Sequence, residues 1–367
     1  MTKALKTIIK IFLMIIFLIS HMVSGTVSGL EGKNIILIDD ASLNLEQKIE
    51  RAEKAFSGKF KGDYFLTGYY VNTKGGNMSF GTFITSSEER TSRISHEGDS
   101  LRIYHHMASD FDKGDNYKKR IALFLHKKTG KKFQVVNAVT LNGGARYKID
   151  GLPLYLLGEP GVDESFNYVK DLFTSAENER SRKRFISVIA VHDHKDTSSF
   201  LYDTASGDRG IELRKTAIFW LGACGAESSY TYLKKLSDKT KEKKIIKSLI
   251  FAFHNLDSKE GNRELIKIAK GTSHPSARED AIFWLGQRAS KESIGTLKNI
   301  IDNDKNTDVK NSAIFALSQL DDDRSIPILI DIVKNNKNPR IKKKAMFWLG
   351  QKDDKRVIDL FESILLK

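Results

Sequence analysis

The sequence predicts an α+β protein of several domains, in which an α-solenoid follows a smaller antiparallel β domain. Three observations predict this class: an apolar segment that returns at a fixed period in residues 151–367, short β-type runs in residues 30–150, and a basic and apolar leader in residues 1–25. The chain is 40% hydrophobic and 29% charged, a globular composition that excludes wholesale disorder. Its one cysteine excludes a disulfide scaffold.

Residues 1–25 are predicted to be a signal peptide that directs export. A basic region with three lysines precedes a nine-residue apolar run, and the small residues Ser24 and Gly25 follow where signal peptidase would cut. The run is shorter than the roughly 20 residues that a spanning helix needs, although an uncleaved membrane anchor stays open as the alternative. The lysines are Lys3, Lys6 and Lys10, and the run is residues 11–19. We therefore expect a periplasmic or extracellular protein.

Cleavage of this leader predicts a mature chain whose N-terminus, determined by N-terminal sequencing, lies near Thr26 or Leu30. Recovery of the chain with an intact Met1 from a membrane fraction would contradict cleavage and favour the anchor.

Residues 30–150 are predicted to form an antiparallel β-meander with one helix. The helix is expected over residues 44–56, because four apolar side chains share one face there and Gly58 follows. Runs of β-branched, aromatic and alternating apolar residues come after it, separated by glycine-containing turns. The expected strands are residues 64–71, 78–85, 101–107, 120–126 and 133–141.

An apolar block recurs through the C-terminal part of the chain. Its clearest copies, residues 217–222, 281–286 and 345–350, contain Phe-Trp-Leu-Gly and are evenly spaced. Weaker copies lie halfway between them, so the period is about 32 residues, a length typical of helical repeats. These copies are residues 249–254 and 313–318, and two further registers fall at residues 185–190 and 153–158. Seven registers without an insertion predict a stack of helical units.

Each unit carries two helical patterns. In residues 293–301 the apolar positions are spaced as on one face of a helix. A polar turn at residues 302–306 follows, and a second helix then carries the apolar block. Pro275 and Pro339 stand at the matching turn of two other units, where proline favours the start of a helix. The second helix has almost no polar face, which predicts that it is buried between neighbouring units.

The block from Arg278 to Gln287, together with its period, resembles the short bacterial HEAT repeats, the type also seen in phycobilin lyase subunits. The resemblance covers about residues 151–367 and implies a solenoid of about seven helix pairs. It also implies that the second helix of each pair lines the concave side. That repeat family serves mostly as scaffold, so the resemblance implies a role in protein–protein interaction. Together with the predicted leader, it indicates a secreted bacterial protein with HEAT repeats.

The position after the phenylalanine of the block alternates between a large and a small side chain. One set of units has Trp220, Trp284 and Trp348, and the other has Val188, Ala252 and Ala316. An indole that fills the space beside a neighbour's small residue would explain the alternation, so we interpret the three tryptophans as structural core. The alternative is a ladder on which a ligand stacks, a less common role for aromatic residues at repeat spacing.

Exposed positions of the second helices are the predicted partner-binding residues. One register just before the apolar block recurs once in each unit. It holds Lys215, Lys247, Glu279, Asn311 and Lys343. These side chains should form a ladder on one side of the stack, and three lysines among five favour an acidic partner. Simple solvation of the surface would produce the same pattern.

No catalytic, metal or cofactor site is predicted. The chain has no GxSxG motif, P-loop or GxGxxG motif. The segment from His192 to Asp196 holds two imidazoles and two carboxylates, but it falls at a predicted turn without a third histidine, so no metal is expected there. HEAT-like repeats also occur in the iron enzyme deoxyhypusine hydroxylase, which binds metal through His-Glu pairs. The His-Glu pair of this chain, His96-Glu97, lies outside the repeats.

The formal net charge of +14 is spread over both domains rather than gathered in one basic block. A secreted protein meets little DNA, so no nucleic-acid partner is expected, whereas the lysine clusters are compatible with peripheral contact with an anionic envelope surface. The predicted function is a non-enzymatic scaffold whose solenoid binds other proteins of the cell envelope. The alternative is an enzyme subunit resembling bilin lyases, which would hold a small molecule on the concave face. No feature of the sequence indicates an oligomeric state.

Overall fold

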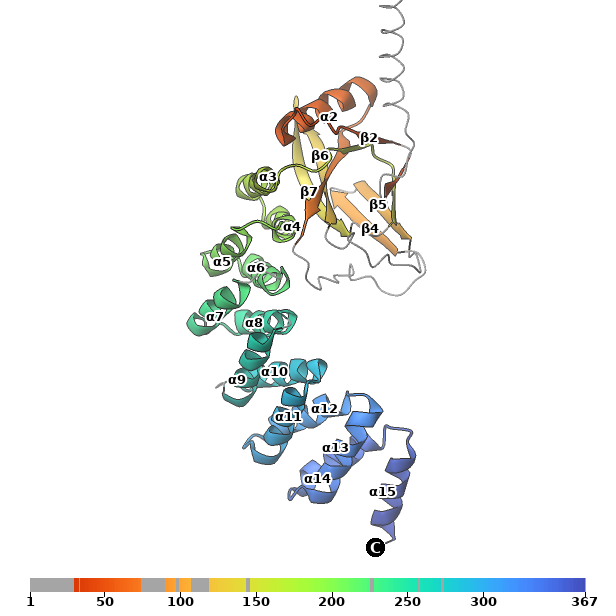
Figure 1. The fold of residues 1–367 in the computed structure, drawn as a ribbon, viewed down its shortest axis with the longest axis vertical. Helices are drawn as coiled ribbons and strands as arrows, with labels where there is room; N and C mark the ends of the chain where they lie inside the picture. The colour runs from red at the N-terminus through yellow and green to blue at the C-terminus, as the bar shows by residue number, and fades with distance from the viewer. Residues whose placement is uncertain are drawn as a thin grey trace, which may run out of the picture. The chain divides into compact units, whose positions relative to one another are not determined.

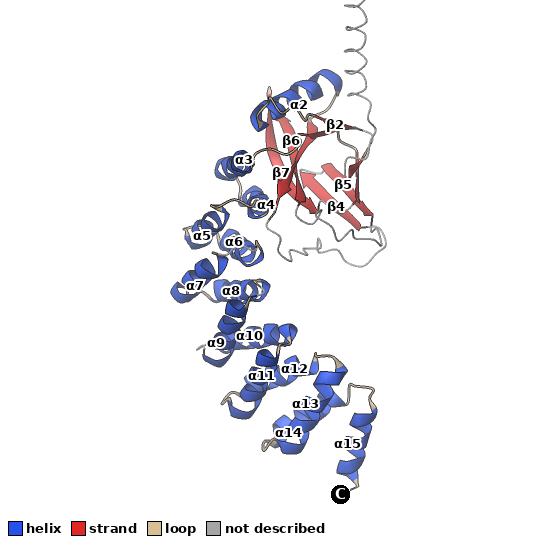
Figure 2. Cartoon of the chain, viewed as in Figure 1, coloured by secondary structure: helices blue, strands red, loops and turns tan. Residues whose placement is uncertain are grey.

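The computed structural model describes residues 30–73 except 33, then 90–96, 99–106, 119–142, and 146–366 except 225–227, 257, 272 and 273. The predicted signal peptide and the predicted strand over residues 78–85 lie outside these residues. The chain divides into two compact units, residues 1–197 and 198–367, which are described in turn. Figure 1 shows the elements in chain order, and Figure 2 separates the strands, all before α3, from the helical array that follows.

Helix α2, Leu45–Lys59, confirms the predicted N-terminal helix. A capping box starts it: the Asn44 side chain accepts a hydrogen bond from the Gln47 amide, and the Gln47 side chain accepts one from the Asn44 amide. The sequence predicts that Gly58 lies just past the end of this helix, but the helix continues to Lys59. Its C-cap is Phe60, whose amide donates a hydrogen bond to the Phe56 carbonyl.

The β strands form two sheets rather than one meander. The five-stranded sheet has the order β2-β9-β3-β6-β7 and the four-stranded sheet the order β1-β8-β5-β4. The strands are β1 Leu30–Glu31, β2 Ile35–Leu37, β3 Tyr64–Asn72, β4 Arg90–His96, β5 Asp99–His106, β6 Lys119–Thr129, β7 Lys132–Asn142, β8 Arg146–Asp150 and β9 Leu154–Leu156. Strands β3, β6 and β7 pair antiparallel as expected, whereas β9 runs parallel to both β2 and β3, which makes the sheet mixed.

The first repeat register, predicted over residues 153–158, is wrong. Leu154, Tyr155 and Leu156 form strand β9 and are fully buried between β2 and β3. A short continuous apolar run fits a buried strand as well as a buried helix, so periodicity alone does not separate the two. The helical array therefore begins after this strand.

The five-stranded sheet buries both of its faces. Leucine and isoleucine side chains of one face pack into the core cluster shared with β1 and β8. On the other face, the Phe65 ring lies 5.0 Å from Phe56 of α2, measured between centroids, and stacks on His126 at 4.4 Å. Burial lowers the pKa of His126 to about 3, so this imidazole is neutral at pH 7 and pairs with the Thr67 hydroxyl at 2.8 Å.

The first helix pair belongs to the same unit as the sheets. Helix α3, Val162–Ser175, carries Glu164, whose carboxylate accepts a hydrogen bond from the amide of Leu45 at the start of α2. Helix α4, Glu179–Ala190, packs against β7. The turn after α4 adds a hydrogen bond from the Asp193 amide to the Asn72 carbonyl of β3. These contacts join the start of the helical array to the β domain.

The second unit confirms the predicted solenoid. First and second helices of the pairs alternate along the chain. Each second helix packs on the second helix of the following pair, α6 on α8, α8 on α10, α10 on α12 and α12 on α14 (Figure 1). The helices are α5 Thr197–Ser206, α6 Ile211–Ala223, α7 Ser229–Lys239, α8 Lys243–Asn255, α9 Lys259–Gly271, α10 Pro275–Arg288, α11 Lys291–Asn303, α12 Thr307–Ser318, α13 Asp322–Asn335, α14 Pro339–Leu349 and α15 Lys355–Leu365. Pro275 and Pro339 stand at the first position of α10 and α14, as predicted.

Two glycines of the apolar block face small residues of the neighbouring second helix. A Cβ atom on Gly222 of α6 would lie 2.5 Å from the Ala252 carbonyl oxygen of α8, and one on Gly286 of α10 would lie 2.9 Å from the Ala316 Cβ of α12. Backbones therefore approach closely at these two contacts, and the expectation that an indole fills the space beside a neighbour's small residue stays a prediction. None of the helices in the described part of the chain combines the length and apolarity that crossing a bilayer requires.

Candidate binding face of the solenoid

A row of phenylalanines follows the predicted partner-binding ladder at a distance of one helical turn. The rings belong to the second helices and recur once in each unit. They are Phe219, Phe251, Phe283, Phe315 and Phe347. Each lies four residues after a ladder residue, so both rows share one face of their helices. We call the five phenylalanines, together with Trp220, Trp284 and Trp348, the aromatic face.

The aromatic face is open to solvent although its neighbours in sequence are core. Phe283 is 40% exposed and Phe347 is 53% exposed, whereas Ile282 and Leu285 are fully buried. The remaining members are partly buried. Large apolar side chains repeated along one exposed face are typical of an interaction surface rather than of random exposure.

The three tryptophans, predicted as structural core, are partly exposed members of this face. The Trp284 ring packs 4.9 Å from Phe251 and 4.4 Å from His254, both on the preceding second helix. Trp348 lies 5.1 Å from Phe315 in the same manner. Trp284 and Trp348 therefore bridge neighbouring second helices at the surface.

The predicted partner-binding ladder, called the polar ladder from here on, is less basic than its sequence indicates. It consists of Lys215, Lys247, Glu279, Asn311 and Lys343. The Lys215 ammonium lies 2.9 Å from a Glu212 carboxylate oxygen, and the Lys247 ammonium lies 3.5 Å from Asp280. Lys343 is exposed on α14, whereas Glu279 and Asn311 are half-buried and carry no positive charge. The residue after Lys343, Lys344, sits over the Phe347 and Trp348 rings at 5.3 and 5.7 Å.

Another row of basic side chains has a structural role. Arg214 and Arg278 donate to the carbonyls of Ala205 and Ala269, which lie in the last turn of the preceding helix. Lys310 and Lys342 do the same, at the carbonyls of Asp302 and Lys334. These four residues share a register in which α8 has Ile246 instead. Their charge is used to cap the first helices.

Two cavities lie between units of the solenoid. One, of about 240 Å³, opens between the first turns of α8 and α10 and is lined by Lys243, Lys244, Lys247, His274 and Asp280, among others. The other, of about 470 Å³, lies near the turns that connect α11 with α12 and α13 with α14 and is lined mostly by polar residues, together with Ile301 and Ile332. The lining of the first cavity ends one helical turn before Phe251 and Trp284 of the aromatic face.

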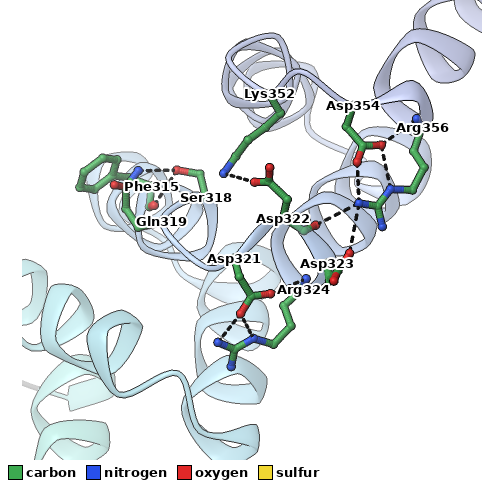
Figure 3. Close-up of polar contacts among 10 residues, drawn as sticks. All are labelled: Phe315, Ser318, Gln319, Asp321, Asp322, Asp323, Arg324, Lys352, Asp354 and Arg356. Carbon is green, nitrogen blue, oxygen red and sulfur yellow. Dashed lines mark hydrogen bonds and ion pairs between the residues drawn. The ribbon is translucent and has the colours of Figure 1, made fainter.

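A run of three aspartates at the start of α13 is neutralised by nearby cations (Figure 3). The Asp321 carboxylate accepts a hydrogen bond from Arg324 at 2.6 Å, and Asp322 accepts one from Lys352 at 2.8 Å. Asp323 lies 3.6 Å from Arg356, which also donates to Asp354. Hydrogen bonds from Arg356 lower the pKa of Asp354 to about 2. This acidic run ties α13 to α14 and α15.

The histidines considered for a metal site hold the turn after α4 together. His194 stacks on Phe166 at 4.0 Å, and its Nε2 atom lies 2.9 Å from an Asp163 carboxylate oxygen. His192 is buried, bonded through Nδ1 to the Val188 carbonyl, and burial lowers its pKa to about 4. The part of the chain that the structure describes contains no group of three His, Cys, Asp or Glu side chains suited to a metal ion.

The stacked helix pairs form a HEAT-like solenoid. The family model described as HEAT repeats matches residues 262–350, which span α9 to α14. Among the solved structures, a chain of the CpcE–CpcF complex of phycocyanin lyase from Nostoc sp. PCC7120 is similar at 15% identity, with 52% of this chain and 77% of that chain covered and a TM-score of 0.31. No curated protein matches the chain.

Sequence reasoning found the polar ladder but missed the aromatic face beside it. The signal was present, since phenylalanine occupies the same register in five consecutive units. The continuously apolar block around it predicts burial of the whole helix, and only the packing of the helices shows which of those residues face outward. The sequence shows the lysines Lys243 and Lys244 side by side. The cavity that they line also needs His274 and Asp280, which are distant in sequence.

Proposed function

We propose that the chain is an exported, non-enzymatic scaffold that binds another protein through the aromatic face and the polar ladder beside it. The observation that carries this proposal is the exposure of Phe283 and Phe347 at the same register of a repeated, otherwise buried block. Exposure of such rings to water is unfavourable in free energy. A partner that covers the rings removes this cost. HEAT repeats support a role in binding, because stacked units offer extended surfaces to partners.

The composition of the face suits a protein partner. Aromatic residues are enriched at the centres of protein interfaces, where they bury a large area at low conformational cost. The polar ladder and the aromatic face run side by side, so that a polar rim accompanies an apolar centre. Export is supported by the basic and apolar sequence of residues 1–25, and it places the partner in the cell envelope.

The test is capture of envelope proteins by three immobilised forms of the full chain. We expect the double variant Phe283→Ser with Phe347→Ser to lose at least about 90% of the partners that the wild type retains, since interface centres dominate affinity. The matched control is Ile358→Ser on α15, because Ile358 is 54% exposed but lies outside the aromatic face. The control should retain the partners.

Equal retention by the double variant and the wild type, with circular dichroism confirming both folds, would contradict the proposed face. The alternative enzyme subunit predicts a different result. In that case a small molecule, detected by absorbance or mass spectrometry, copurifies with the wild type and is lost from the double variant, while protein capture is unchanged.

A further inference from the structure

The groove between α8 and α10 combines a basic cavity with part of the aromatic face. Three lysines and one aspartate line the cavity of about 240 Å³, together with His274 and the first turn of α10. Lys247 keeps 74% of its side chain exposed although it lies near Asp280. The cavity therefore carries an excess of positive charge that faces solvent.

Two of these lysines have no structural partner. Within the residues that the structure describes, the side chains of Lys243 and Lys244 make no hydrogen bond or ion pair. This distinguishes them from Lys310 and Lys342, whose ammonium groups cap the helices α11 and α13. Exposed lysines usually solvate a surface, but here two of them border a concave space instead of a flat face.

The cavity and the rings are continuous along both helices. Its lining ends at Lys247 on α8 and Asp280 on α10, and the aromatic residues Phe251 and Trp284 follow four residues later on the same two helices. One helical turn rises about 5.4 Å, so a ligand of a few residues reaches from the lysines to the rings. The two rings lie 4.9 Å apart, one on each of the two helices.

The chain contains a second pair of the same rings at the equivalent register, beside residues of different charge. Two units further along the chain, Phe315 and Trp348 pair at 5.1 Å between α12 and α14. The positions equivalent to Lys243, Lys244 and Lys247 are there Thr307, Asp308 and Asn311. The repeat therefore tolerates neutral and acidic residues at these positions, and the three lysines are not required by the fold.

We propose that the groove between α8 and α10 binds an acidic segment of the partner protein that carries an apolar residue next to its carboxylates. The carboxylates enter the cavity beside Lys243, Lys244 and Lys247, and the apolar side chain covers Phe251 and Trp284. This assignment rests on the proposed function, since it specifies what the binding face recognises. Charge complementarity selects the acidic partner and sets the register along the face.

The shape of the site favours a polypeptide over a membrane. The cavity is smaller than the roughly 300–1,000 Å³ of small-molecule sites and suits one or two side chains. A membrane surface engages residues that protrude from a face, whereas this positive charge borders a recess between two helices. An anionic lipid surface is therefore the competing outcome of the test.

The probe is a fluorescein-labelled peptide of four glutamates followed by Gly-Phe-Leu-Phe, titrated with the full chain and followed by fluorescence anisotropy. We expect binding that the variant Lys243→Thr with Lys244→Asp weakens by about tenfold or more, since both charged contacts are lost. This variant carries the residues that the chain itself uses at positions 307 and 308. The control, Lys267→Thr with Lys291→Asp, makes the same charge change on the exposed surface of α9 and α11 and should bind as the wild type does.

Two further peptides complete the test. Exchange of the glutamates for lysines should abolish binding, and exchange of Phe-Leu-Phe for serines should weaken it. Equal binding of the glutamate peptide by the wild type and the groove variant would overturn the proposal. The proposal would also be overturned if the wild type did not bind the peptide but sedimented with phosphatidylglycerol vesicles, and if this sedimentation depended on Lys243 and Lys244. If envelope proteins are still captured through Phe283 and Phe347 in either case, the proposed function stands and only this assignment falls.

Discussion

Replacement of Gly222 by alanine is expected to destabilise the solenoid by about 3 kcal/mol, although alanine is the better helix former. The added Cβ would lie 2.5 Å from the Ala252 carbonyl oxygen and 2.7 Å from the Ala252 Cα. Both are backbone atoms, so α6 and α8 must move apart to admit the methyl group. Urea unfolding of the full chain, followed by circular dichroism, measures the loss.

Gly295→Ala is the matched control for this prediction. Gly295 lies inside α11, and a Cβ there would meet nothing within 4 Å. Its replacement should therefore stabilise the chain by up to about 1 kcal/mol through helix propensity alone. Opposite signs for the two substitutions would show that Gly222 is kept by helix contact. A stabilised Gly222→Ala variant would contradict the close packing of α6 on α8.

Arg278→Ala is expected to destabilise the solenoid by about 3 kcal/mol. The guanidinium donates to the Ala269 carbonyl at 2.9 Å and to both carboxylate oxygens of Asp304, and each side chain of the pair is only 13% exposed. Burial raises the pKa of Asp304, but the hydrogen bonds from Arg278 and the Asn306 amide outweigh it and hold that pKa below its usual value. Loss of Arg278 leaves a half-buried carboxylate without its cation.

Arg214→Ala provides the comparison two units earlier in the chain. Arg214 caps Ala205 at 3.0 Å and pairs with Glu242, but that pair is more exposed, at 23% and 46%. We expect a smaller loss, about 1 kcal/mol, because solvent screens the pair. Urea unfolding of the two variants tests the difference between these stability losses. The midpoints can be compared directly if the dependence of the unfolding free energy on urea has the same slope in both variants. Equal losses would show that burial does not set the strength of these caps.

The solenoid was predictable because its pattern is local and repeated. Each second helix carries the same apolar block, and Pro275 and Pro339 mark the starts of two of them. The β domain was predictable only where strands are long. Strand β6 is a long apolar run and β7 alternates, whereas the three-residue strands β2 and β9 have no period and are placed by pairing with distant partners.

The candidate site was predictable only in part, because the repeat period places residues along a helix but does not give their contacts. The register of Lys215 and Lys247 follows from the period, but their pairing with Glu212 and Asp280 depends on side-chain geometry. The exposure of Phe283 follows from which side of α10 approaches α12, and Gly286 decides that by admitting Ala316. Sequence therefore places residues on a helix face, while packing decides whether that face is buried.

Photo-crosslinking tests the central claim, that the aromatic face binds a protein partner, most directly. A photoreactive phenylalanine is incorporated in place of Phe283, Phe347 or Ile358, the last as an equally exposed position on α15. The cells are irradiated and the crosslinked species are resolved by mass. The account predicts the same discrete protein adduct from positions 283 and 347 and none from position 358. An adduct from position 358 alone, or no protein adduct from position 283 or 347, would contradict it.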